Sequence, residues 1–107
     1  CRDGIPNHGA YGELLGTPDS AGELLDMIMT PGFSRPDQWQ VQIQAQIQLK
    51  ARVLVKADGL TNEQLRAAKF DPLPDVSSGV KSALQEAGPH ARLCVLPQGP
   101  QTVPYLK

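Results

Sequence analysis

The chain contains few side chains that could do chemistry: two histidines, two cysteines and one tryptophan. His8 lies in a loop rich in Gly and Pro, and His90 directly follows a predicted helix end. Neither has a second His or a carboxylate at the sequence spacing of metal ligands. We therefore interpret both histidines as solvated loop residues and predict no metal site.

The two cysteines are too few for a disulfide framework or a four-thiolate metal site. Cys94 lies in the apolar run Leu-Cys-Val-Leu, and burial in a strand would raise the pKa of its thiol. We predict a buried structural thiol at this position. Cys1 lies near Arg2 and His8 and could be reactive, but the residue is equally explained as the cut end of a longer chain. We predict no catalytic residue.

The segment Asp58-Gly59-Leu60-Thr61 places a Gly and a helix start after a predicted strand. Ligands of α/β sheets bind at such positions, but ordinary strand-to-helix turn chemistry explains these residues equally well. The chain has no Gly-rich loop of the kind that cradles phosphates or dinucleotides. Its single tryptophan, Trp39, follows a loop at the start of an element, where it could be a core anchor or the wall of a pocket.

The elements that must position these residues alternate between helix and strand. Helices are predicted for residues 10–15, for a segment that ends near residue 29, for 61–69, and for about 75–87, and strands for 52–57 and 91–96. The second helix could begin at Thr17 with Pro18, or at Ser20 with Glu23. A strand, a helical crossover and a strand imply a parallel pair. We predict an α/β fold, a small parallel-sheet sandwich with helices packed on the sheet, as one domain over residues 1–107.

Residues 36–50 carry two conflicting signals. Apolar residues alternate strictly with glutamines from Trp39 to Leu49, and a period of two is typical of a half-buried strand. As a helix, the same residues form two opposed apolar stripes, Trp39/Ile43/Ile47 and Val41/Ala45/Leu49. That arrangement suits a helix packed between two layers. The period alone favours a strand.

Composition excludes several classes of function. Ten Lys and Arg against eleven Asp and Glu give a net charge of −1, which provides no general electrostatic attraction for nucleic acid or anionic lipid. Apolar runs reach about four residues, whereas a membrane span needs roughly 18. No signal-peptide core is present, so we expect a cytoplasmic protein. Because the chain begins with Cys1 and not with Met, we expect a C-terminal fragment of a longer protein.

Several segments, in their order and spacing, resemble the C-terminal part of the nickel-dependent lactate racemase family. They are Cys1-Arg-Asp-Gly4, Pro31-Gly-Phe33, Asp37-Gln-Trp-Gln40, Lys50-Ala51 with Val53-Leu-Val55, Leu96-Pro-Gln-Gly99 and Thr102-Val-Pro104. The resemblance extends over essentially the whole chain. Family members have a helix at the position of residues 36–50, and on that ground we predict a helix there, against the period.

The resemblance implies a two-lobed α/β enzyme with its active site between the lobes, which racemises or epimerises a 2-hydroxy acid by hydride abstraction and return. It implies a nickel pincer nucleotide in the complete protein, held by residues of the larger N-terminal lobe that this chain does not contain. Trp39 matches the family tryptophan that faces the substrate, and is the one substrate-binding residue we predict. No catalytic, cofactor-binding or metal residue is implied in this chain.

The implied partners are the missing N-terminal lobe of the same chain and a small 2-hydroxy acid, with no nucleic acid or membrane. On this hypothesis the isolated domain is folded but inactive. An alternative is a non-catalytic α/β binding or interaction module whose Gln-rich segment joins a partner. A weaker alternative is a small independent enzyme that uses Cys1, His8 or His90. Paired histidines and a lysine in the reading frame upstream of Cys1 would favour the first hypothesis.

Overall fold

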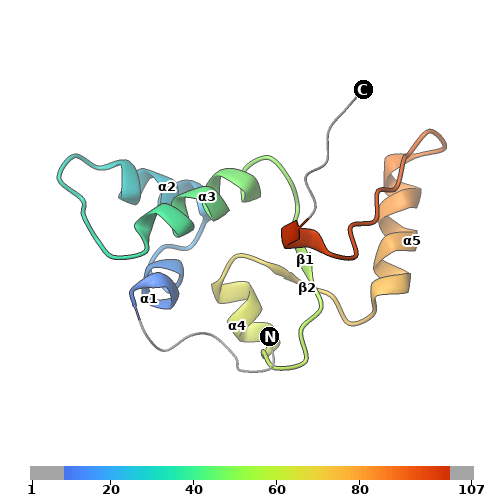
Figure 1. Ribbon diagram of the computed structural model, residues 1–107, viewed down its shortest axis with the longest axis horizontal. Coiled ribbons are helices and arrows are strands. Elements are labelled where there is room, and N and C mark those ends of the chain that lie inside the picture. Colours follow the sequence, from blue (N-terminus) through green and yellow to red (C-terminus); the bar gives the residue numbers. More distant parts are fainter. Residues whose placement is uncertain (1–8, 102–107) are drawn as a thin grey trace. The chain divides into compact units, whose positions relative to one another are not determined.

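A computed structural model describes residues 9–101. The helices are α1 (Tyr11–Gly16), α2 (Ala21–Met29), α3 (Gln38–Gln48), α4 (Asn62–Ala67), α5 (Val76–Ala87) and the short 3₁₀ helix η1 (Gly99–Gln101), and the strands are β1 (Leu54–Val55) and β2 (Asp71–Pro72). The fold is mostly helical with a very small parallel sheet (Figure 1). No helix within residues 9–101 is long and apolar enough to cross a membrane.

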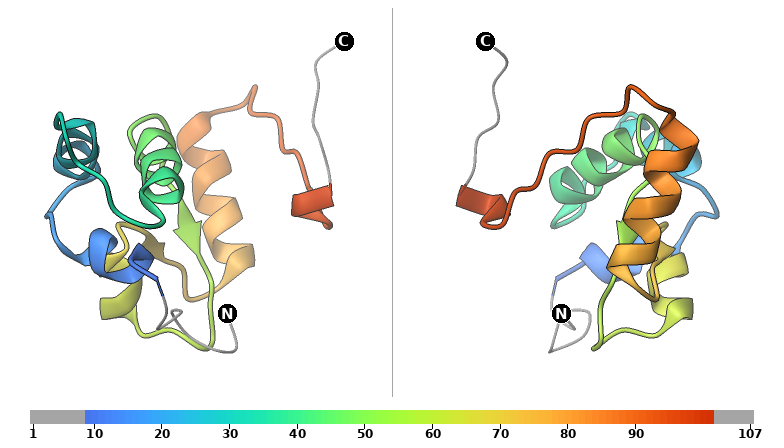
Figure 2. Two further views of the ribbon diagram at one scale, coloured as in Figure 1. Left: turned by 60° about the vertical axis from the view of Figure 1, so that its left-hand side comes forward. Right: turned by 90° about the vertical axis from the view of Figure 1, so that its right-hand side faces the viewer.

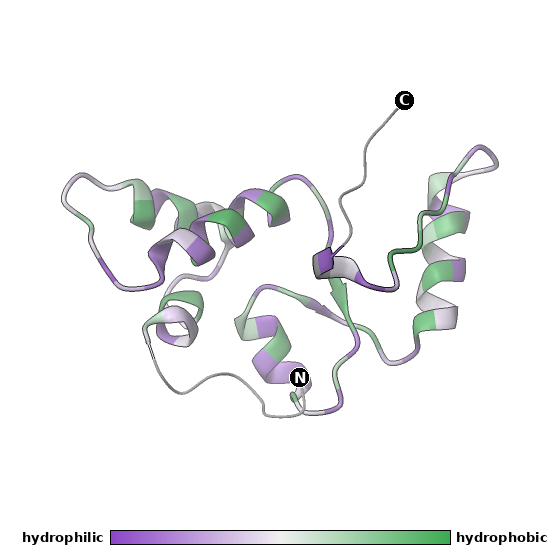
Figure 3. Cartoon of the chain, in the orientation of Figure 1, coloured by the Kyte–Doolittle hydropathy of each residue, from purple (hydrophilic) through white to green (hydrophobic). Residues whose placement is uncertain are grey.

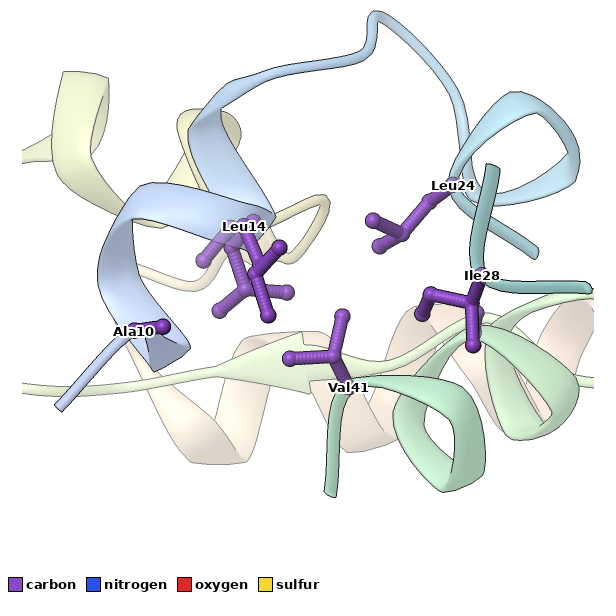
Figure 4. Close-up of a cluster of buried hydrophobic side chains, with 8 residues drawn as sticks. Ala10, Leu14, Leu24, Ile28 and Val41 are labelled. Atoms are coloured by element: carbon purple, nitrogen blue, oxygen red, sulfur yellow. The ribbon is translucent and has the colours of Figure 1, made fainter. Parts of the chain in front are cut away.

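The chain divides after Asp75 into two compact units. Helices α1, α2 and α3 of the first unit pack around one apolar core, with α2 and α3 side by side (Figure 2). Figure 4 shows this core, whose buried members are Ala10, Leu14, Leu15, Leu24, Ile28, Val41, Ala45 and Ala68. The two units do not decide whether residues 1–107 form a single domain, which remains a prediction.

Local capping sets where the helices of this unit begin. Of the two starts open to α2, the structure uses Ser20, whose hydroxyl accepts the backbone N–H of Glu23 at 3.2 Å. At α4 the capping box expected of Thr61 and Gln64 is complete: the Thr61 hydroxyl accepts the Gln64 N–H, and the Gln64 side chain accepts the Thr61 N–H at 2.8 Å. Such reciprocal bonds satisfy two backbone donors that the helix itself leaves unpaired.

The sheet is parallel, as predicted, but the predicted pairing partner is wrong. Strand β1 pairs with β2, and residues 91–96 have no strand assignment. The backbone N–H groups of Asp71 and Leu73 donate to the carbonyls of Val53 and Val55 at 3.0 and 2.9 Å. Between them, Pro72 has no N–H to donate, and its nitrogen is on the opposite edge of β2, where none is required. Reading the prolines of this segment only as chain breakers therefore missed a strand.

Within the segment 36–50 the structure has a helix, α3 (Gln38–Gln48), as the resemblance predicted and the period did not. An α-helix advances about 100° per residue, so side chains four apart share a face. Between residues 39 and 49 the glutamines are at even positions and the apolar residues at odd positions. A step of four residues joins even positions only to even ones and odd positions only to odd ones. Each stripe along α3 is therefore either wholly apolar or wholly glutamine.

The second unit contains α5, the extended residues 91–96 and η1. The predicted end of α5 at Gly88 is confirmed, since Gly88 has φ of +85°, a conformation typical of glycine after a helix. None of the α5 side chains is buried. Cys94 is exposed, which overturns the prediction of a buried thiol. The physical reason is that a run of apolar residues is buried only when another element covers it, and Leu93 and Val95 are exposed too.

Candidate functional site

Trp39, the one residue predicted to bind substrate, lies in the first turn of α3. It is 60% exposed, and it is absent from the buried core that α3 shares with α1 and α2. The core-anchor interpretation of Trp39 therefore does not hold in this structure. Contact with a substrate remains a prediction.

Two polar contacts attach the start of α3 to α1 and its flank, and a third is local to the start of α3. The Asp37 carboxylate accepts the backbone N–H of Ala10 through Oδ2 at 2.9 Å. The Arg35 guanidinium donates to both carboxylate oxygens of Glu13 at 2.9 Å. The Gln38 side chain accepts the Arg35 N–H at 2.7 Å. Arg35 and Asp37, both just before Trp39 in the sequence, thus attach the start of α3 to α1 and its flank.

Asp37 occupies the cap position of α3 in an unusual conformation. Its φ of 64° lies in the left-handed region, and its side chain makes no bond to the α3 backbone. That conformation costs free energy in a non-glycine residue. In this conformation the Asp37 carboxylate accepts the N–H of Ala10. The side chain therefore makes a tertiary contact and does not cap its own helix.

Two glutamines of α3 hold the helix against α1 and α4. The Tyr11 hydroxyl donates to Gln44 Oε1. The Gln44 Nε2 donates to the Ala68 carbonyl at 2.8 Å, and Gln48 Nε2 donates to the Lys69 carbonyl at 2.8 Å. Burial raises the pKa of the Tyr11 hydroxyl. This glutamine stripe therefore acts as polar packing, and it lies beside the apolar stripe of Trp39.

Lys69 joins the ends of two helices. Its ammonium donates to the carbonyls of Leu15 and Ala67, both at 2.6 Å, groups that the last turns of α1 and α4 leave unpaired. Burial lowers the pKa of Lys69, and the negative charges of Asp19 and Glu23 act in the opposite direction. We interpret this as a structural role, because the ammonium group links the ends of α1 and α4 through these two hydrogen bonds.

The other candidates for chemistry are not brought together. Cys1 and His8 lie outside the described residues. His90 is exposed in a turn, and Cys94 is exposed in the extended segment that follows. The turn at Asp58 and Gly59 leads into the Thr61 capping box, so turn and cap chemistry account for its residues.

No group of three His, Cys, Asp or Glu side chains between residues 9 and 101 could hold a metal ion. The scattered, exposed donors of this part of the chain therefore do not fit a nickel centre. Sequence reasoning also missed the roles of Gln44 and Gln48. The available signal was their spacing of four, which places them on one face of a helix but not of a strand.

Comparison with known proteins gives a family. Residues 1–103 match the family model of the lactate racemase C-terminal domain. A lactate racemase of Thermoanaerobacterium thermosaccharolyticum is 26% identical over 101 residues, which cover 92% of this chain and 24% of that protein. The chain thus spans about a quarter of the length of the curated relative that it matches. No solved structure matches it.

Proposed function

Because this chain belongs to the lactate racemase C-terminal domain family, we propose that it is the substrate-side part of a racemase or epimerase that acts on a 2-hydroxy acid. The family match over residues 1–103 carries the proposal. The family is defined as the C-terminal domain of lactate racemase. On this proposal, an N-terminal lobe of the same polypeptide supplies the rest of the active site. On this proposal the 107-residue chain has no turnover by itself.

Trp39 is the residue of this chain that we assign to the substrate. Its indole is exposed at the start of α3, and the attachment of Asp37 to Ala10 and of Arg35 to Glu13 holds that helix start in place. An indole offers a large apolar face and a single N–H donor. That combination suits a small molecule in which a short apolar group lies beside a carboxylate. The identity of the hydroxy acid is a separate matter, since related members act on other hydroxy acids or sugar acids.

The family resemblance implies a nickel pincer nucleotide in the complete enzyme, where it would supply the hydride acceptor. The donors within residues 9–101 do not fit such a group, since no three of them converge. We therefore assign its binding residues to the N-terminal lobe and derive no step of this chain through it.

The test uses the complete protein. Purified enzyme is incubated with single enantiomers of lactate and of other 2-hydroxy acids, and the second enantiomer is measured by chiral chromatography. We expect interconversion of at least one of them, and we expect Trp39→Ala to lower turnover at least tenfold. The matched control is Asp26→Ala, at an exposed charged position of α2, which should leave turnover unchanged. Absence of interconversion with every acid, or equal turnover of both variants, would contradict the proposal.

A further inference from the structure

Helix α3 has an apolar side that the described residues of the first unit leave about half exposed. One apolar stripe, with Val41 and Ala45, is buried in the core. The opposite stripe is exposed: Ile43 is 49% and Ile47 is 51% exposed, in line with Trp39. Figure 3 shows hydrophobic and hydrophilic bands alternating along this helix. Contiguous exposed apolar side chains of this kind mark surfaces that bind something.

The exposed stripe borders a groove of about 260 Å³. Its apolar lining comes from Ile43 and Ile47 of α3, from Val53 just before β1, and from Phe70 just before β2. Gln48 also lines it, and the buried Gln48 Oε1 has no hydrogen-bond donor among residues 9–101. A buried acceptor without a donor costs free energy, so this part of the groove lining is not fully satisfied by the described residues alone.

The charge pattern separates this helix from the other helices of its unit. Helix α3 contains no charged residue, whereas α1 carries Glu13, α2 carries Glu23 and Asp26, and α4 carries Glu63 and Arg66. The groove lining is also uncharged. Depletion of charge together with an aromatic side chain is typical of the buried centre of an interface and not of a surface that faces water.

We propose that the N-terminal lobe of the same polypeptide packs on the α3 outer stripe, which we define as Trp39, Ile43 and Ile47 with the adjoining groove. This inference rests on the proposed function, because the C-terminal domain family and a relative about four times as long supply that lobe. Trp39 then lies where the packed surface meets the substrate cleft, and Ile43 and Ile47 lie inside the packed surface.

The test is the rate of thiol alkylation in the complete protein, resolved by peptide mass spectrometry so that native cysteines do not interfere. Ile43→Cys and Ile47→Cys are compared with Asp26→Cys, a matched position on an exposed helix face. We expect the cysteines at 43 and 47 to react at least tenfold more slowly than the cysteine at 26, at every protein concentration. Equal rates would overturn the inference. Slow reaction that appears only at high concentration would also overturn it, because it would assign the surface to a second copy.

Hydroxyl-radical footprinting of the unsubstituted protein provides the same comparison without a variant. Corrected for intrinsic reactivity, Ile43 and Ile47 should be oxidised at least fivefold more slowly than Leu49, which is exposed on another side of the helix. Equal oxidation would refute the packing. Neither readout depends on turnover, so a protein that racemises nothing but protects these residues would refute only the hydroxy-acid function.

Discussion

Gly9 and Asp37, 28 positions apart in the sequence, lie so close together that the Asp37 carboxylate occupies the place of a side chain at residue 9. A Cβ built on Gly9 would lie well under 3.0 Å from the Asp37 carboxylate oxygen Oδ2. The same oxygen accepts the N–H of the next residue, Ala10, at 2.9 Å. Gly9 also has φ of +72°, which side chains disfavour. The close approach of the chain before α1 to the start of α3 therefore depends on the absence of a side chain at residue 9.

The first prediction follows from that contact. Gly9→Ala should lower the free energy of unfolding by about 1–3 kcal/mol, because it adds left-handed strain and displaces the Asp37 carboxylate. Gly16→Ala is the control, since its added Cβ would have no described atom within 4 Å apart from its chain neighbours and its own helix backbone. That substitution should be neutral or stabilise by up to about 1 kcal/mol. Urea-induced unfolding measures both, and equal effects would show that the contact is absent.

The second prediction concerns the core. Leu24 is fully buried between α1, α2 and α3, so Leu24→Ala should destabilise by about 2–5 kcal/mol through lost apolar transfer and a remaining cavity. Leu49 is 55% exposed at the end of α3. Leu49→Ala in the same unfolding experiment should therefore lose less than about 1 kcal/mol. A reversed order would mean that Leu24 does not occupy the centre of the core.

The third prediction concerns Trp39 as a structural residue. A buried tryptophan truncated to alanine loses about 3–5 kcal/mol, and Trp39→Ala in this chain should lose clearly less because the side chain is exposed. Trp39 is the only tryptophan of the chain, so its fluorescence is specific. We expect iodide to quench it strongly in the 107-residue chain. Full protection from iodide, with unfolding of the alanine variant, would support a core role instead.

The fourth prediction is a pH dependence. Burial lowers the pKa of Lys69 below 10.5 in the folded chain, so between the lowered value and 10.5 the unfolded chain binds more protons than the folded chain. In that window this group makes the free energy of unfolding rise with pH. The variant Lys69→Met has no ammonium group at this position and serves as the reference. The stability of the original chain relative to the Met variant should therefore increase as pH rises through the window, at constant ionic strength. A constant or falling difference in urea midpoints would contradict the burial of the ammonium.

The fifth prediction concerns nickel. The 107-residue chain should bind no nickel ion stoichiometrically at submicromolar concentration, because its histidines and cysteines lack ligand spacing. Calorimetric titration of the chain with nickel ions checks this. A stoichiometric, tight site would show that the termini supply ligands, and would move the metal from the N-terminal lobe into this domain.

Local chemistry made much of the fold predictable. Ser20, Thr61 and Gly88 each specify a helix end through a bond or a backbone angle that depends on near neighbours only. The pairing of β1 was not predictable in the same way. It depends on which segment reaches the Val53 and Val55 carbonyls, and Asp71 and Leu73 do so from a segment that propensity marks as a turn.

The candidate site, too, has features that near neighbours specify and features that depend on distant packing. That Trp39 is exposed does not follow from its type, because the same α3 sequence offers two apolar stripes and only packing against α1 and α2 decides which one is buried. Periodicity favoured a strand because it counts alternation along the chain. It carries no information on whether Gln44 and Gln48 find partners, and those partners lie on α1 and just after α4.

The stripe pattern of α3 makes the helix intolerant of changes in length. Deleting one residue inside α3 rotates everything after it by about 100° and exchanges even positions for odd ones. Glutamines would then enter the core at the places of Val41 or Ala45. Apolar side chains would face the carbonyls of Ala68 and Lys69, which would lose their glutamine donors. Even an insertion of four residues, which keeps the order of the stripes, would rotate the following turns by about 40°. Natural variation in the length of this segment should therefore be confined to the loops on either side of it.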